Sequence, residues 1–199
     1  TVIQHATTRA LEGGVRTRDT LLAAEAVADT GTPCVVMTYW NLVEHYGVDA
    51  YARDLASAGG AGLITPDLTP DEAEEWMAVS EAHGLDRVFL VAPSSTDERL
   101  ASTVAACRGW VYATSVMGVT GTRAQTSSAA PELVARVKAV NSEIPVGVGL
   151  GVSNGDQAAE VGSFADGVIV GSALVRALVE AEEQGETAHV GIDRMRTIV

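Results

Sequence analysis

The sequence predicts an α/β protein built from repeated βα units. Six short β-branched runs each open into a loop, and each loop is followed by a stretch rich in Ala, Leu and Glu with helical spacing. Most of these runs lack the alternation of polar and apolar residues of a half-exposed sheet, so we expect parallel strands buried on both faces. No linker rich in Gly and Ser interrupts the series, which predicts a single domain over residues 1–199. Six parallel units fit either a doubly wound sheet or most of a (β/α)8 barrel.

The predicted elements follow a strict order of strand then helix, after two leading helices at 3–11 and 18–28. The predicted strands are 34–38, 62–65, 87–91, 110–114, 145–149 and 167–170. The predicted helices are 47–59, 71–83, 96–107, 131–142, 154–162 and 172–184. Pro70 and Pro131 mark two helix starts, because proline suits the first helical turn.

The leading helices stand where a βα protein should begin with a strand, so we expect a segment ahead of them. A complete barrel typically needs about 250 residues. Six units and one leading helix fall short of eight units by a strand, a helix and a strand. If the fold is a barrel, its first strand, first helix and second strand would thus be absent from this sequence.

Composition and charge exclude several classes of function. With 26 acidic and 13 basic residues the formal charge is −13, which would repel a nucleic-acid backbone. Cys34 and Cys107 stand far apart without a CxxC or Cys/His cluster, which indicates neither a disulfide framework nor a metal site and favours the cytoplasm. No apolar run reaches about 18 residues and no signal-peptide pattern opens the sequence, so we expect no membrane association.

Three glycine-rich segments follow the last predicted strands, at 117–121, 147–151 and 171–173. Functional groups of parallel βα folds lie at the carboxyl ends of the strands. Glycine there lets backbone N–H groups approach an anion, and a helix N-terminus adds a partial positive charge. The pattern predicts a phosphorylated small molecule as the ligand, although the 147–151 glycines alone are equally typical of a tight turn.

At these residues the sequence resembles the alpha subunit of tryptophan synthase. The likeness extends over nearly the whole chain, to about Arg176. The stretches that carry it are IQHA (3–6) with ALEGG (10–14), MTYWN (37–41), YG (46–47), AGGAGLITPDL (58–68), FLVAP (89–93), SVMGVTG (115–121), and GLGVS (149–153) with ADGVIVGSA (165–173). Their common order makes the resemblance specific.

The resemblance implies a (β/α)8 barrel that cleaves indole-3-glycerol phosphate to indole and glyceraldehyde 3-phosphate by a retro-aldol step. It further implies no metal or cofactor in this subunit, and a partner beta subunit that carries pyridoxal phosphate in an alpha2beta2 heterotetramer. Cleavage needs a proton at indole C3 and removal of one from the glycerol hydroxyl, tasks suited to carboxyl groups.

The family's catalytic glutamate and aspartate would both precede Thr1, so we expect them on a segment ahead of this sequence. Without them, an alternative is a catalytically silent barrel that binds a phosphorylated ligand and activates a beta-type partner by docking. A phosphosugar barrel isomerase is a third reading, but it needs an aspartate on each side of the pocket and only Asp67 is well placed.

The resemblance also assigns individual residues. Tyr112 matches a tyrosine whose hydroxyl could touch the glycerol chain, and an aromatic filler of the barrel is the alternative. Asp67 matches a residue at the subunit contact, and a simple turn ahead of a helix is its alternative. Tyr39 and Leu150 would lie beside the indole ring, with Leu150 in place of a commoner phenylalanine.

The expected phosphate pocket consists of Gly121, Gly151, Gly171 and Ser172. Residues 121–130 form a polar loop after the fourth predicted strand, 110–114, long enough to act as a lid. Such a lid would carry Thr120 and Gly121 onto the substrate.

Overall fold

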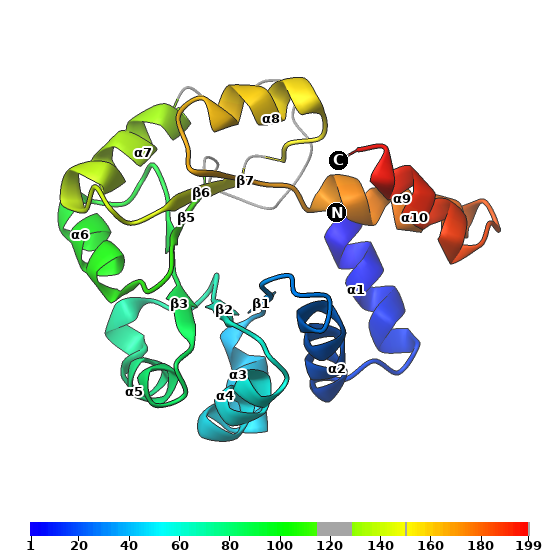
Figure 1. Ribbon diagram of the computed structural model, residues 1–199, viewed down its shortest axis with the longest axis horizontal. Coiled ribbons are helices and arrows are strands. Elements are labelled where there is room, and N and C mark those ends of the chain that lie inside the picture. The colour runs from blue at the N-terminus through cyan, green and yellow to red at the C-terminus, as the bar shows by residue number, and fades with distance from the viewer. Residues whose placement is uncertain (115–128, 150, 199) are drawn as a thin grey trace.

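The computed structural model describes residues 1–114, 129–149 and 151–198, as a succession of parallel strands and helices. Its helices are α1 (Val2–Glu12), α2 (Thr17–Ala28), α3 (Trp40–Tyr46), α4 (Val48–Ser57), the 3-10 turn η1 (Pro70–Glu72), α5 (Glu74–Ala82), α6 (Asp97–Ala106), α7 (Ala129–Val140), α8 (Gly155–Gly162), α9 (Ser172–Glu183) and α10 (Ala188–Arg196). Its strands are β1 (Val35–Met37), β2 (Gly62–Ile64), β3 (Asp86–Val88), β4 (Leu90–Val91), β5 (Val111–Thr114), β6 (Val146–Gly149) and β7 (Gly167–Ile169). Figure 1 shows the strands as a curved inner layer with α4 to α8 outside it.

The strands pair in parallel in two sheets, ordered β1-β2-β3 and β4-β5-β6-β7. The predicted run 87–91 spans both sheets, since Phe89 separates β3 from β4. The Val88 carbonyl accepts from Thr65 N at 3.2 Å, while the Phe89 carbonyl accepts from Tyr112 N at 3.1 Å. The chain therefore passes from one sheet to the other at Phe89, and the six predicted strands form one succession.

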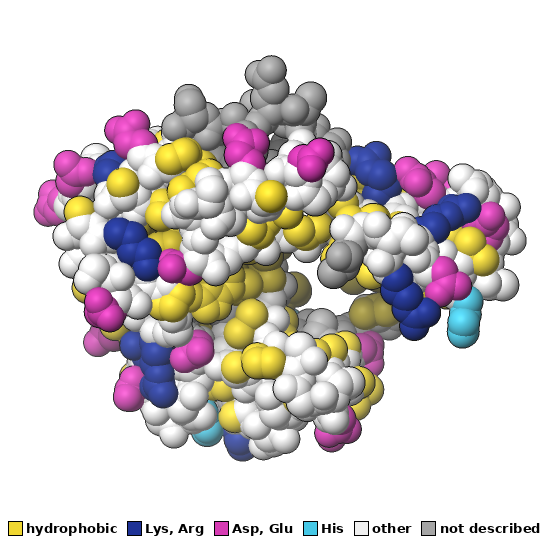
Figure 2. Space-filling view, turned by 45° about the horizontal axis from the view of Figure 1, so that its top comes forward, with side chains coloured by type: hydrophobic (Ala, Val, Ile, Leu, Met, Phe, Trp, Pro, Cys, Tyr) yellow, Lys and Arg dark blue, Asp and Glu magenta, His cyan; other side chains and the backbone are white. Residues whose placement is uncertain are grey.

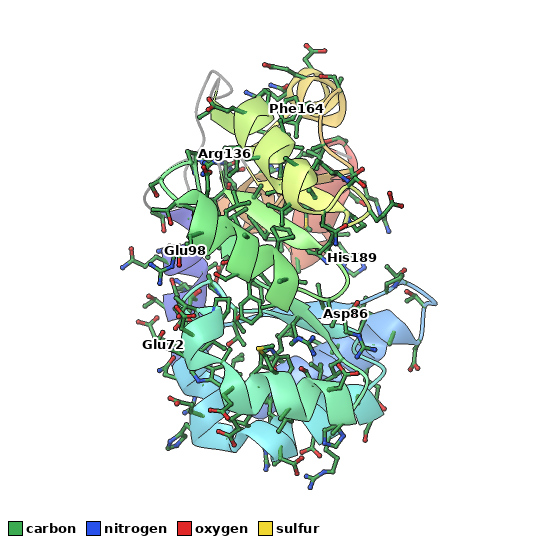
Figure 3. All side chains as sticks on the ribbon, turned by 90° about the vertical axis from the view of Figure 1, so that its left-hand side faces the viewer. Glu72, Asp86, Glu98, Arg136, Phe164 and His189 are labelled. Atoms are coloured by element: carbon green, nitrogen blue, oxygen red, sulfur yellow. The ribbon has the colours of Figure 1, made fainter. Side chains whose placement is uncertain are left out.

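Local signals explain where several helices begin. The Thr96 hydroxyl accepts from Arg99 N at 3.2 Å ahead of α6, and the Asn154 side chain accepts from Gln157 N at 2.9 Å ahead of α8. Figure 3 views the strand layer from the side, with Glu72 and Glu98, in η1 and α6, toward one edge and Asp86, which begins β3, toward the other. The segments that follow the strands thus share one edge of the molecule.

Two apolar cores fill the space between strands and outer helices. One lies under α4 and α5, with Tyr51, Leu55 and Trp76 among its fully buried side chains. The other lies under α6 and α7 and includes Leu100 and Leu133. A third cluster lies on the opposite, inner side of the strands.

The inner cluster joins Ile64, Val88 and Tyr112, with Val35, Leu90, Trp110 and Ile169 packed against it. Its members come from β1, β2, β3, β4, β5 and β7, together with Trp110, which immediately precedes β5. Because successive side chains of a strand point to opposite faces, Val111 and Ala113 belong to the outer core.

Glycines on β6 make room for two aromatic rings of this inner cluster. A Cβ at Gly147 would lie 2.6 Å from the Trp110 ring, and one at Gly149 would lie 2.2 Å from the Tyr112 hydroxyl. Both glycines therefore serve packing inside the strand layer. Both lie within β6, in agreement with the predicted strand 145–149, and only Gly151 of this glycine run follows the strand.

The burial predicted for the strands holds for β2, β5 and β6, is partial for β3 and β4, and is wrong for β1 and β7. β2 is wholly buried, and β5 and β6 are buried except at their last residue. In contrast, β7 is only half-buried and Met37 of β1 is 51% exposed. Among the described residues β1 and β7 each pair with one neighbour, so no strand pairs with their outer edges. Figure 2 shows the molecule hollowed in the middle of one face, with apolar side chains around the hollow.

Two helices were absent from the sequence-based expectation. The predicted helix 47–59 is preceded by α3, and the two meet at Gly47, whose φ of +98° suits glycine. The other is α10, which packs against α9 after a turn at Gly185. Residues 129–130, expected in the polar lid, belong to α7.

Asp166 ties the two strands that carry the last glycine loops. Its carboxylate accepts from Val146 N at 2.8 Å and lies 2.7 Å from the Lys138 ammonium of α7. The Lys138 side chain first, and then the Val146 N–H, hold the pKa of the Asp166 carboxyl below its usual range. The charged carboxylate therefore stabilises the junction of β6, β7 and α7.

We expect Gly147→Ala to lower the free energy of unfolding by about 1–3 kcal/mol, because the added methyl group overlaps the Trp110 ring. The measurement is urea denaturation followed by circular dichroism. Gly155→Ala is the matched control, since its Cβ would meet open space at the start of α8. Equal stability of the two variants would contradict the packing role of Gly147.

Asp166→Asn should lower the free energy of unfolding by about 0.5–1 kcal/mol at neutral pH, since it removes the charge beside a half-exposed Lys138 pair. The folded-state pKa of Asp166 is depressed, so this stability is present above the unfolded value of about 4 and is lost as pH falls through the folded value. Urea denaturation of both proteins should give curves that converge in acid. A gap between Asp166→Asn and the wild type that stays constant with pH would argue against the charge effect.

Candidate functional site

The last two glycine loops lie side by side because β6 and β7 are parallel and in register. Gly149 pairs with Ile169, so Gly151 and Gly171 each stand two residues beyond the same rung of the sheet. Gly151 has a φ of +70°, which favours glycine. The structure thus brings both predicted glycines to one edge, at the carboxyl ends of adjacent strands.

The first turn of α9 is open to an anion. Gly171 is the residue ahead of this helix and supplies no side-chain cap, so the first backbone N–H groups of α9 have no side-chain acceptor there. A Cβ at Gly171 would meet nothing within 4 Å. Ser172 opens the helix and is half-buried. The N–H groups at the helix start, the helix dipole and a hydroxyl together are suited to a phosphate group.

Three predicted site residues fall on parts of the chain that the structure does not describe. Thr120 and Gly121 belong to 115–128, and Leu150 stands between the described residues Gly149 and Gly151. The predicted lid lies outside the described residues for the same reason, apart from its end in α7.

Tyr112 lies on the inner face of β5 with 9% of its surface exposed. Its ring packs against Trp110, with centroids 5.9 Å apart and planes 25° from parallel. Burial raises the pKa of the phenol, which keeps it protonated. No hydrogen-bond partner of the hydroxyl is found among the described residues, so the phenol remains able to bind a ligand oxygen.

Asp67 binds the start of α3, directly after Tyr39, at the carboxyl ends of β1 and β2. Tyr39 is 64% exposed and immediately precedes the helix. Both carboxylate oxygens of Asp67 accept from Trp40 N, at 2.9 and 3.1 Å. Asp67 therefore joins the loop after β2 to α3, the helix that follows β1.

Sequence reasoning missed Trp110. The signal that could have found it is the WVY run of 110–112 beside the GVG run of 147–149, because large residues alternating on one strand need small ones on the next. Without the register of β5 against β6, the two patterns had no visible connection.

Other features of the described residues add no second site. A groove of about 540 Å³ lies between α1 and α9, lined by residues such as Ala6, Ala10 and Leu178, beyond the first turn of α9. No cluster of three metal-binding side chains occurs in the part of the chain that the structure covers. None of the helices described has both the length and the hydrophobicity needed to cross a bilayer.

Comparison with known proteins places this geometry in one family. The family profile described as "Tryptophan synthase alpha chain" matches residues 1–196. The tryptophan synthase alpha chain of Mycobacterium marinum is 70% identical over 176 residues, which cover 88% of this chain and 65% of the relative. That of Salinispora tropica is 68% identical over 180 residues, covering 90% and 67%.

Solved structures support the same family. A structure of Mycobacterium tuberculosis tryptophan synthase superimposes with a TM-score of 0.90 and 63% identity, over 99% of this chain and 71% of that one. The tryptophan synthase A-subunit of Pyrococcus furiosus gives a TM-score of 0.85 at 29% identity, over 99% and 78%.

The chain spans about two thirds of the length of these curated relatives. The match runs through both glycine loops and the strands that carry them. It confirms the predicted (β/α)8 barrel class, and it excludes a doubly wound sheet. This chain belongs to the tryptophan synthase alpha chain family.

Proposed function

We propose that this chain forms the phosphate-binding part of a lyase that cleaves indole-3-glycerol phosphate to indole and glyceraldehyde 3-phosphate. Family membership supports the reaction. The observation that carries the ligand class is the pairing of Gly149 with Ile169, which brings Gly151 beside the uncapped start of α9.

In this proposal the phosphate lies against Gly171 and Ser172, where the helix dipole and backbone N–H groups neutralise its charge. Thr120 and Gly121 would close on it. Tyr112, whose hydroxyl is available on the inner face of β5, contacts the glycerol chain, and Tyr39 and Leu150 line the indole ring.

Bond cleavage requires a proton at indole C3 and removal of another from the glycerol hydroxyl. The proposal assigns these transfers to the glutamate and aspartate that the family resemblance places ahead of Thr1. The described residues then have the tasks of holding phosphate and shaping the pocket, with no metal or cofactor in this subunit.

We also propose that the chain acts as one domain, 1–199, against a beta subunit that carries pyridoxal phosphate, in an alpha2beta2 heterotetramer in the cytoplasm. Cys107 packs against both outer cores, which supports one domain. Met37, Tyr39 and Leu42 are exposed and flank Trp40 in sequence, whose backbone N–H donates to Asp67, and exposed apolar side chains of this kind are typical of a protein contact.

The test is indole release from indole-3-glycerol phosphate by the natural full-length protein, alone and with a beta subunit of the family. We expect slow cleavage alone and faster cleavage in the complex. Intact mass of the same sample shows whether a segment carrying the two acids is present. If the chain speeds turnover by the beta subunit but cleaves no substrate, the silent, docking barrel would instead be established. If the chain neither cleaves the substrate nor speeds the beta subunit, both functions would be rejected.

Gly171→Val should abolish binding of a phosphorylated ligand, because its side chain would fill the anion's approach to α9. The measurement is calorimetric titration with glyceraldehyde 3-phosphate. Gly155→Val, at the start of α8, is the matched control and should bind as the wild type does. Unchanged affinity of Gly171→Val would place the phosphate elsewhere.

A further inference from the structure

Trp110 has no assigned role, yet it lies directly against the side chain expected to meet the substrate. The Trp110 and Tyr112 rings stack on the inner side of the strand layer. Both belong to the inner cluster, whereas Val111 between them faces the outer core. Their contact is therefore built into the two-residue repeat of β5.

The two rings lean in the same direction along the sheet. Tyr112 pairs with Gly147, but its hydroxyl is the atom nearest to a Cβ at Gly149, two residues nearer the carboxyl end of β6. Trp110 stands one residue before Val111, which pairs with Val146, yet its ring is the group nearest to a Cβ at Gly147. Each ring is thus displaced by two residues toward the edge where the loops lie.

This common direction of the two rings determines where the Tyr112 ring has room to lie. The Trp110 ring lies over Gly147, the residue that pairs with Tyr112 itself. A Tyr112 ring that tilted back toward the amino end would overlap it. With Gly149 leaving room in the other direction, the phenol is held toward the carboxyl end of the inner face.

We propose that Trp110 is a positioning residue, whose ring supports Tyr112 and holds the phenol hydroxyl toward the ligand-binding edge of the barrel. The role deepens the proposed function, since the hydroxyl then meets the glycerol chain of the substrate. The support itself depends only on the packing of β5 and β6.

The surroundings of Tyr112 leave its hydroxyl dependent on the position of the ring. The described residues in its cluster are all apolar or aromatic, from Ile64 and Val88 to Leu90 and Ile169. They offer the hydroxyl no alternative partner, and burial keeps the phenol protonated. Its hydrogen bond to a ligand therefore depends on where the ring is held.

The first test is a pH titration of the natural full-length protein labelled with [13Cζ]tyrosine, in which Tyr112→Phe identifies the signal. In Trp110→Leu the Tyr112 ring loses its support, and we expect its pKa to fall toward that of an exposed tyrosine. Trp110→Phe should retain most of the wild-type value, because a flat ring remains. Trp76→Phe, in the outer core under α5, is the control and should leave the Tyr112 signal in place.

A Tyr112 signal that titrates identically in Trp110→Leu and the wild type would overturn the proposal. So would an equal shift in Trp76→Phe, because loosening of the whole fold would then explain the change.

The second test measures cleavage of indole-3-glycerol phosphate by the same variants in complex with the beta subunit. We expect Trp110→Leu to lower kcat/KM about tenfold, and to lower it less than about twofold when Tyr112 is already Phe, because the effect passes through the hydroxyl. Equal losses in both backgrounds would reject positioning. If the wild type shows no cleavage, the proposed function fails while the tyrosine titration still decides the role of Trp110.

Discussion

The parallel register of β6 between β5 and β7 is the constraint on which the site depends. Toward β5 it sets Gly147 and Gly149 beneath two aromatic rings. Toward β7 it brings the segments that begin at Gly149 and Ile169 to the same edge. A slip of one residue would turn the glycines away from the rings and separate Gly151 from the start of α9.

The inner face and the carboxyl edge are therefore coupled through one strand. The absence of side chains at Gly147 and Gly149 admits Trp110 and Tyr112, and the same strand leads to the glycine loop at the edge where α9 begins. Asp166 adds a charged bond across the opposite end of this pair of strands, because it accepts from Val146 N and pairs with Lys138. Rigid strands on both sides can hold a ligand loop in place with few contacts of its own.

The contrast between the two halves of the site has a physical basis. At β6 and β7, backbone groups and a helix start dominate, which suits an anion whose charge needs many N–H donors. At β1 and β2, Asp67 joins two loops and leaves Tyr39, Met37 and Leu42 exposed. That surface is apolar and fits a protein or an aromatic ring better than a phosphate.

The sequence by itself determined the order of strands and helices and placed the glycines at 151 and 171 after the last two strands, because β-branched runs, helical spacing and turn residues are local signals. Those signals fit a doubly wound sheet as well as a barrel, and the barrel class came from the family resemblance that the sequence also carries. The local signals left the pairing of the strands open. The sequence could not determine that Phe89 joins two sheets, that α3 precedes α4, or that strands at the ends of the succession stay half-exposed. Those features depend on pairing between distant segments. Only the tertiary structure separated the GVGLG glycines into two that admit aromatic rings and one, Gly151, that follows the strand with a positive φ, since the rings come from a segment more than thirty residues away in sequence.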